Sequence, residues 1–72
     1  METTSIRLPI QNLPKQFDRS RISTVLDEIE IALMDDGGVY ASTSANSFTI
    51  TVEVPTTQLV DATACLRVLK VI

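Results

Sequence analysis

The chain lacks the covalent and metal crosslinks that commonly stabilise a very small domain. Its 72 residues include one cysteine, Cys65, and no histidine, so a disulfide framework and a zinc site are excluded within one chain. A domain of this length buries only about 60% of the surface that its unfolded chain exposes. Stability must therefore come from a well-packed apolar core, from association with another chain, or from both.

The composition permits such a core and determines its character. Hydrophobic residues make up 44% of the sequence, but the aromatic ones are Phe17, Tyr40 and Phe48 alone. A core must consist mainly of isoleucine, valine and leucine side chains. No linker, repeat or change of composition divides the chain, so we expect one domain over residues 1–72.

Two segments alternate between apolar and polar residues as half-buried strands do. Pro9 cannot donate to a strand ladder, so the strand predicted over residues 4–10 should lie at a sheet edge. Residues 38–55 predict a hairpin with its turn near residues 44–47, where Asn46 can adopt a positive φ. The predicted core face of the second arm consists of Phe48, Ile50, Val52 and Val54. In the weaker first arm, Val39, Ala41 and Thr43 alternate with Tyr40, Ser42 and Ser44.

Residues 18–36 have the periodicity of an amphipathic helix. Asp18 can cap the first backbone N–H groups, and Gly37 can adopt the left-handed conformation that ends a helix. The apolar stripe of this helix consists of Ile22, Val25, Leu26, Ile29 and Leu33.

A second helix is predicted after Pro55, with Thr56 or Thr57 as its N-cap. Its main apolar stripe consists of Leu59, Ala62, Leu66 and Leu69. No turn residue interrupts the end of this segment, which favours a helix throughout. Residues 67–72 also alternate, so a fourth strand is the alternative there.

The elements follow the order β-α-β-β-α, which is an α+β arrangement. The crossover from the first strand to the second should be right-handed. The simplest packing is a single antiparallel sheet of order 1-3-2 with both helices on one face. This fold is a ferredoxin-like split βαβ unit that lacks its last strand.

No catalytic or metal-binding pattern is present. Cys65 has no histidine to act as its base, and its position beside Leu66 predicts a small buried thiol rather than a nucleophile. The Asp-Asp-Gly-Gly segment at residues 35–38 lacks the other ligands of a calcium loop and the lysine of a phosphate-binding loop. We expect no enzymatic activity, no metal and no other cofactor.

Nucleic acid and membranes are not expected as partners. The net charge is −3, and the basic residues near positions 15–21 and 67–70 have no aromatic stacking platform beside them. No run of 18 apolar residues could span a bilayer, and the N-terminus lacks the features of a signal peptide. We expect a cytoplasmic protein.

The acidic charge is concentrated in the first predicted helix. Residues 18–36 carry six acidic and two basic side chains, a net of −4, whereas the rest of the chain has a net charge of +1. Arginines lie at the start of this helix and Asp35 and Asp36 at its end, which is opposite to what the helix dipole favours. Residues that disfavour their own local structure, with no compensating contact, tend to mark functional sites.

The same helix places Ile31 and Met34 on its solvent side. An apolar centre with a charged rim is the layout of an interface. The predicted partner-binding surface consists of Asp27, Glu28, Ile31, Met34, Asp35 and Asp36.

The second predicted helix is apolar on more than one side, and a chain this short has too little material to cover both. We predict self-association through its second strip or through the free edge of the first strand. That strip consists of Val60, Ala64, Val68 and Val71.

These features predict a small interaction module without catalytic activity. It would regulate or inhibit a larger protein that presents a basic, partly apolar surface, and it would form a homo-oligomer. Small acidic proteins of this kind are often encoded by phages or plasmids, which is a base-rate consideration only. The alternative is a subunit that binds a small ligand, or catalyses a reaction, at a site formed only at an oligomer interface.

Overall fold

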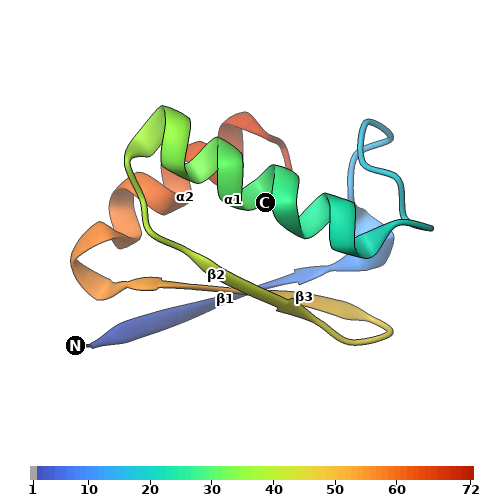
Figure 1. The fold of residues 1–72 in the computed structure, drawn as a ribbon, viewed down its shortest axis with the longest axis horizontal. Helices are drawn as coiled ribbons and strands as arrows, with labels where there is room; N and C mark the ends of the chain where they lie inside the picture. Colours follow the sequence, from blue (N-terminus) through green and yellow to red (C-terminus); the bar gives the residue numbers. More distant parts are fainter. Residues whose placement is uncertain (1) are drawn as a thin grey trace.

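A computed structural model of the chain describes residues 2–72. Three strands form one antiparallel sheet in the order β1-β3-β2, and two α-helices lie over the same face of it (Figure 1). The elements are β1 (Thr3–Pro9), η1 (Ile10–Asn12), α1 (Ile22–Gly37), β2 (Ser42–Ala45), β3 (Thr49–Pro55), η2 (Thr56–Gln58) and α2 (Leu59–Val68), where η marks a 3₁₀ turn. The predicted α+β fold and its strand order are confirmed.

Strand alternation and strand pairing together build the core side of the sheet. Leu8 lies opposite Ile50 and Ile6 lies opposite Val52 in the β1–β3 ladder. Ile50, Val52 and Val54 are fully buried, whereas the residues between them are half-buried or exposed. Because successive side chains point to opposite faces, one side of the sheet packs under the helices and the other stays open (Figure 1).

The core is almost entirely aliphatic. α1 contributes Val25, Ile29 and Leu33, and α2 contributes Ala62 and Leu66, as the helical periodicity predicts. The other core residues are Leu8, Leu13, Phe17, Val39, Ile50, Val52, Val54 and Val71. Within residues 2–72 no polar or charged residue is buried, so hydrophobic burial is what holds the helices on the sheet.

α1 begins at Ile22, four residues later than predicted. The Asp18 carboxylate accepts hydrogen bonds from the Ser20 hydroxyl (2.6 Å) and the Ser20 backbone N–H (2.9 Å), and these bonds lower the pKa of Asp18. The N–H of Arg21 bonds to the carbonyl of Asp18 (3.0 Å). Asp18 therefore closes a separate turn before the helix and does not cap the helix itself.

The two glycines at the end of α1 have separate roles. Gly38, and not Gly37 as predicted, has the left-handed conformation (φ 62°), and its N–H bonds to the carbonyl of Met34 (3.0 Å). Gly37 belongs to the helix and faces α2, where an added Cβ would lie 2.8 Å from Sγ of Cys65. One glycine thus ends the helix and the other allows the two helices to approach closely.

α2 ends in a tight turn, so residues 67–72 neither continue the helix throughout nor form the alternative fourth strand. Lys70 has a positive φ of 62° and its N–H bonds to the carbonyl of Arg67 (3.0 Å), while the N–H of Val71 bonds to the carbonyl of Leu66 (3.2 Å). This pair of hydrogen bonds is a Schellman motif. It turns the Val71 side chain into the core, where 6% of the residue is exposed.

The β2–β3 turn differs from the prediction at Phe48. The side-chain oxygen of Asn46 accepts hydrogen bonds from the N–H groups of Phe48 and Thr49 (both 2.8 Å), so Phe48 belongs to the turn and precedes the strand. Phe48 is 80% exposed, and the prediction that it lies in the core is wrong. Among residues 2–72 the non-glycine residue with positive φ is Lys70, so Asn46 stabilises the turn as an acceptor instead.

Candidate interaction surface

The outer side of α1 presents its predicted residues to solvent. The buried residues of this helix recur every three or four positions, so the positions between them face away from the sheet. Ile31 is 59% exposed and Met34 is 43% exposed. The other four predicted residues are exposed carboxylates: Asp27, Glu28, Asp35 and Asp36. These six residues are called the acidic surface below.

The charges of α1 oppose the helix at its C-terminal end. Its last turn has no basic residue and contains Asp35 and Asp36, and its first turn has no acidic residue. The helix dipole carries partial negative charge at the C-terminus, so each aspartate there disfavours the helix by about 0.3–1 kcal/mol. The free protein therefore gains no stability from these two carboxylates.

Glu30 is an acidic residue of the same helix with a structural role that the sequence analysis missed. It is half-buried, and its carboxylate accepts a hydrogen bond from the Thr43 hydroxyl of β2 (2.7 Å). This bond ties α1 to an edge strand of the sheet. The alternation of the hairpin offered a signal, because it places Thr43 on the core side with Val39 and Ala41.

α2 exposes three of its four predicted residues. Val60 is 81% exposed and Val68 is 76% exposed, and Ala64 between them is exposed as well. These three residues, spaced four apart and therefore on one side of the helix, are called the α2 strip. The inclusion of Val71 in this strip is wrong, because the turn after α2 buries it in the core.

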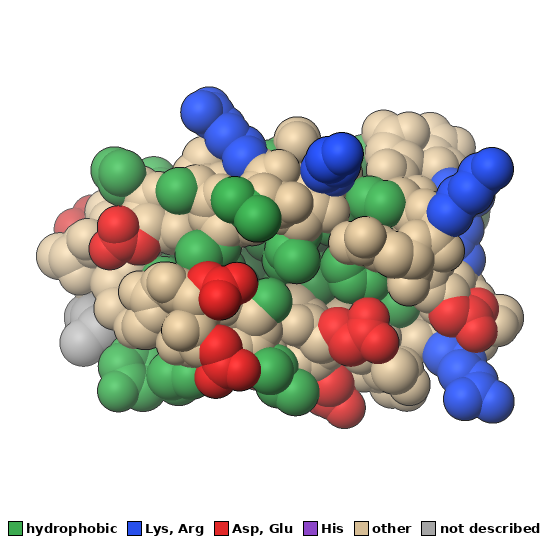
Figure 2. Space-filling view, turned by 90° about the horizontal axis from the view of Figure 1, so that it is seen from above, with side chains coloured by type: hydrophobic (Ala, Val, Ile, Leu, Met, Phe, Trp, Pro, Cys, Tyr) green, Lys and Arg blue, Asp and Glu red, His purple; other side chains and the backbone are tan. Residues whose placement is uncertain are grey.

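The acidic surface and the α2 strip meet where the helices touch. Asp36, Ala64, Cys65 and Val68 line an open hollow at this junction, next to the close approach of Gly37 to Cys65. Figure 2 looks down on this helix layer and shows acidic, basic and hydrophobic side chains exposed together on it. The two surfaces that the sequence predicted separately are therefore parts of one continuous face.

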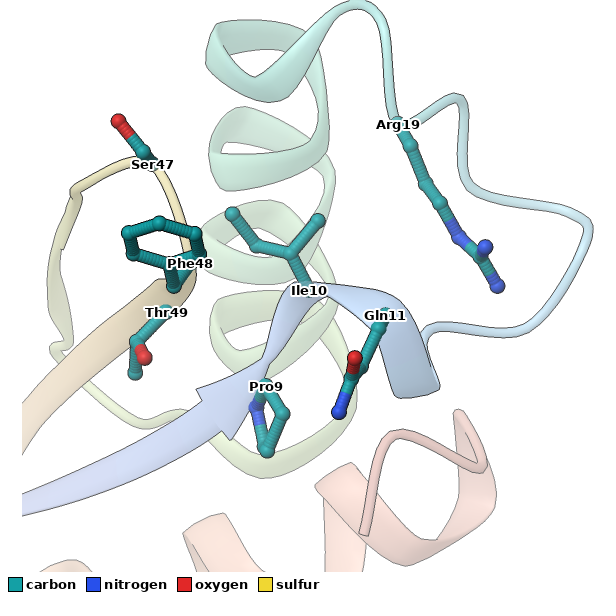
Figure 3. A pocket seen from close by; sticks show the side chains of 7 residues that line it. All are labelled: Pro9, Ile10, Gln11, Arg19, Ser47, Phe48 and Thr49. Atoms are coloured by element: carbon teal, nitrogen blue, oxygen red, sulfur yellow. The ribbon is translucent and has the colours of Figure 1, made fainter.

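A second hollow lies at the tip of the sheet, and the sequence analysis did not predict it. It is formed by the end of β1, η1, the loop before α1 and the β2–β3 turn (Figure 3). The Phe48 ring and the Ile10 side chain stand beside each other there, and Arg19 extends from the loop on the other side. Nη2 of Arg19 donates to the carbonyl of Leu13 (3.0 Å). The hollow could accept an apolar group beside one guanidinium that is already hydrogen-bonded.

A metal ion or a nucleophilic mechanism would need suitable side chains among the described residues. Among residues 2–72 no group of three or more cysteine, aspartate or glutamate side chains could hold a metal ion. Cys65 is a free, half-buried cysteine. In the same part of the chain, neither helix is long and apolar enough to cross a bilayer. The geometry that is present consists of charges and exposed aliphatic side chains on packed helices.

Comparison with known proteins finds no similar protein or family. The chain matches no protein-family model, no curated protein and no solved structure. Its function is therefore inferred from the chemistry of its surface.

Proposed function

We propose that this chain is a non-catalytic interaction module that regulates or inhibits a larger protein by binding it through the acidic surface. The observation that carries the proposal is the exposure of Ile31 (59%) and Met34 (43%) between carboxylates on a helix whose other side is packed. Exposure to water does not stabilise these two apolar side chains. Their burial against a partner would supply a desolvated, apolar centre for the contact.

The carboxylates around that centre determine which partner fits. A surface rich in lysine and arginine would be attracted to them over about 10 Å at moderate ionic strength. Such attraction mainly raises the rate and fixes the orientation of the encounter. The partner is therefore a protein with a basic, partly apolar groove that accepts the outer side of α1.

A labelled amphipathic peptide of leucine and lysine is a direct probe of this chemistry. The parent protein should bind it, and an acidic peptide of the same length should not bind. Ile31→Ala should weaken binding and leave the thermal unfolding curve nearly unchanged. Asp35→Lys with Asp36→Lys should weaken binding, most of all at low salt, while stabilising the free protein by about 0.3–1 kcal/mol per site.

Glu53→Lys is the matched control, because Glu53 is an exposed carboxylate on the open side of the sheet. This variant should bind the probe about as well as the parent does. If the aspartate variant keeps its affinity, or if Ile31→Ala unfolds the protein, then the acidic surface is not the binding site. If the variants behave as expected, proteins captured from a lysate by the parent and by Glu53→Lys, but lost with Ile31→Ala, are the candidates for the natural partner.

A further inference from the structure

The helix layer carries opposite charges along its two long edges. The α1 edge is acidic, and the other edge has Arg67 in the last turn of α2 and Lys70 just after it, both exposed. Figure 2 shows most acidic side chains in the lower half of this face, most basic side chains along its upper edge and right-hand end, and hydrophobic side chains both between them and along the lower edge. A face with this pattern is complementary to itself when one of the two copies is suitably rotated.

The C-terminal part of the α2 edge also has the chemistry that the acidic surface is proposed to bind. The first turn of α2 carries the exposed Asp61, but Arg67 and Lys70 follow the α2 strip, so this end of the edge is basic and partly apolar. We propose that two copies of the chain pack helix layer against helix layer as a twofold dimer, with α1 of each copy on α2 of the other. The dimer covers the acidic surface, so the monomer is the form that binds the partner. This second step rests on the proposed function.

The charges select one of two possible orientations. α1 and α2 run side by side in opposite directions (Figure 1). A twofold axis across the helices would place α1 on α1, with acidic residues facing acidic residues. A twofold axis parallel to the helices places α1 on α2 at both contacts, so that opposite charges meet twice. The parallel axis is therefore the arrangement of the dimer.

The register of the helices brings specific charges together in that arrangement. Gly37 lies beside Cys65, and Asp36 lines the same hollow as Val68. A twofold axis parallel to the helices preserves the level along them, so the end of α1 meets the second half of α2 in the other copy, with Arg67 two residues beyond Cys65. The earlier turns of α1 then lie at the level of the segment after α2, which carries Lys70.

The size of the face determines how firmly such a dimer holds. The whole molecule measures 32 by 17 Å along the two principal axes that lie in this face, so the helix layer cannot be larger. Interfaces of this size fall at the low end of the range, below about 1,200 Å² in total, where contacts are transient. The dimer should therefore dissociate readily on dilution. Such dissociation would make the acidic surface available to the partner.

Charge reversal tests the contact in both directions. One variant carries Asp35→Lys with Asp36→Lys, and a second carries Arg67→Glu with Lys70→Glu. In each variant alone both contacts become repulsive, and sedimentation equilibrium should show dimerisation weakened by roughly tenfold or more. An equimolar mixture should restore dimers, because both contacts between the two variants are attractive. A single chain with all four changes should dimerise on its own.

Arg7→Glu and Glu53→Lys are the matched controls, since both residues are exposed on the open side of the sheet. They should leave dimerisation of the parent nearly unchanged, and thermal unfolding should confirm that every variant is folded. A parent that remains monomeric at high concentration overturns the dimer. So does a mixture in which the two charge-reversed variants stay monomeric.

The leucine–lysine peptide separates this inference from the proposed function. The Arg67→Glu, Lys70→Glu variant keeps the acidic surface and should bind the peptide more tightly than the parent does at concentrations where the parent dimerises. If that variant binds the peptide and the parent proves monomeric, the dimer is wrong and the proposed function stands. If that monomeric variant fails to bind the peptide, the proposed function is wrong whatever the oligomeric state.

Discussion

The two solvent-facing sides of this chain differ in what they expose. The outer side of the helix layer exposes four aliphatic side chains, each by 43–81%: Ile31, Met34, Val60 and Val68. The open side of the sheet presents cross-strand rows of hydroxyl and charged side chains: Ser5, Glu53 and Ser42, and Arg7, Thr51 and Ser44. Both sides are backed by the same core, so the requirements of folding do not explain the difference.

The open side of the sheet shows which residue types this chain has on a surface that faces only solvent. Threonine and serine suit a pleated, solvated surface, and the same alternation that buries Ile50 and Val52 exposes their polar neighbours. The helix layer departs from that pattern with exposed aliphatic residues and with aspartates at the unfavourable end of α1. This difference supports the helix layer, rather than the open side of the sheet, as the location of the proposed binding surface.

The first prediction compares the loss of a buried and of an exposed side chain of α1. Leu33→Ala should destabilise the protein by about 2–5 kcal/mol, because Leu33 is fully buried and its removal leaves a cavity. That loss is large enough to unfold a domain with stability of a few kcal/mol. Ile31→Ala should change stability by only about 0.5 kcal/mol, as exposed positions usually do. Denaturant titrations of both variants would measure the contrast, and similar losses would show that Ile31 belongs to the core.

The second prediction concerns the contact that holds the two edges of the helix layer together. Gly37→Ala should gain about 1 kcal/mol of helix propensity. The new Cβ would lie 2.8 Å from Sγ of Cys65 and 3.2 Å from Cγ2 of Val39, and such overpacking costs about 1–3 kcal/mol. We expect a net loss of stability that Cys65→Ala reverses when the two are combined, since the Sγ is then absent. Stabilisation by Gly37→Ala alone would show that the helices are free to move apart.

Much of this fold could be predicted from the sequence, because the strand and helix periodicities coincide with the buried residues. Ile50, Val52 and Val54 on the sheet are buried as predicted, and so are three of the five stripe residues of α1: Val25, Ile29 and Leu33. The failures lie at the ends of elements, where one hydrogen bond decides the outcome. Asp18 bonds to Ser20 before the helix instead of capping it.

The candidate site was predicted where regular helix geometry holds and missed where the chain leaves it. Ile31 and Met34 lie within the regular part of α1, so the helical periodicity correctly predicted that they are exposed. Val71 is buried because the Schellman turn at Lys70 redirects the chain, and lysine is not the residue that usually marks a left-handed position. Phe48 is exposed because Asn46 holds it in the turn.

The third prediction separates fold stability from charge at the basic edge of the helix layer. Lys70→Gly should stabilise the protein by about 0.5–1 kcal/mol, because its φ of 62° suits glycine better than any L side chain. The same change removes a cation that the proposed dimer uses, so self-association should weaken while the melting temperature rises. Lys70→Ala is the control, since it removes the charge and leaves the backbone strain in place. If Lys70→Gly strengthens both properties, Lys70 takes no part in the contact.

The smallest effect is expected on the open side of the sheet, where Thr49→Val and Thr51→Val test whether that side is inert. Thr51 lies between Arg7 and Ser44 in the sheet, and valine preserves its β-branched shape and its strand preference. Each substitution should alter the free energy of unfolding by no more than about 0.5 kcal/mol. Each should leave both peptide binding and dimerisation unchanged, because neither surface on the helix layer is altered. Loss of either interaction would show that the hydroxyl-bearing side is also a contact surface, and the exposed aliphatic residues would then no longer distinguish the functional side of the molecule.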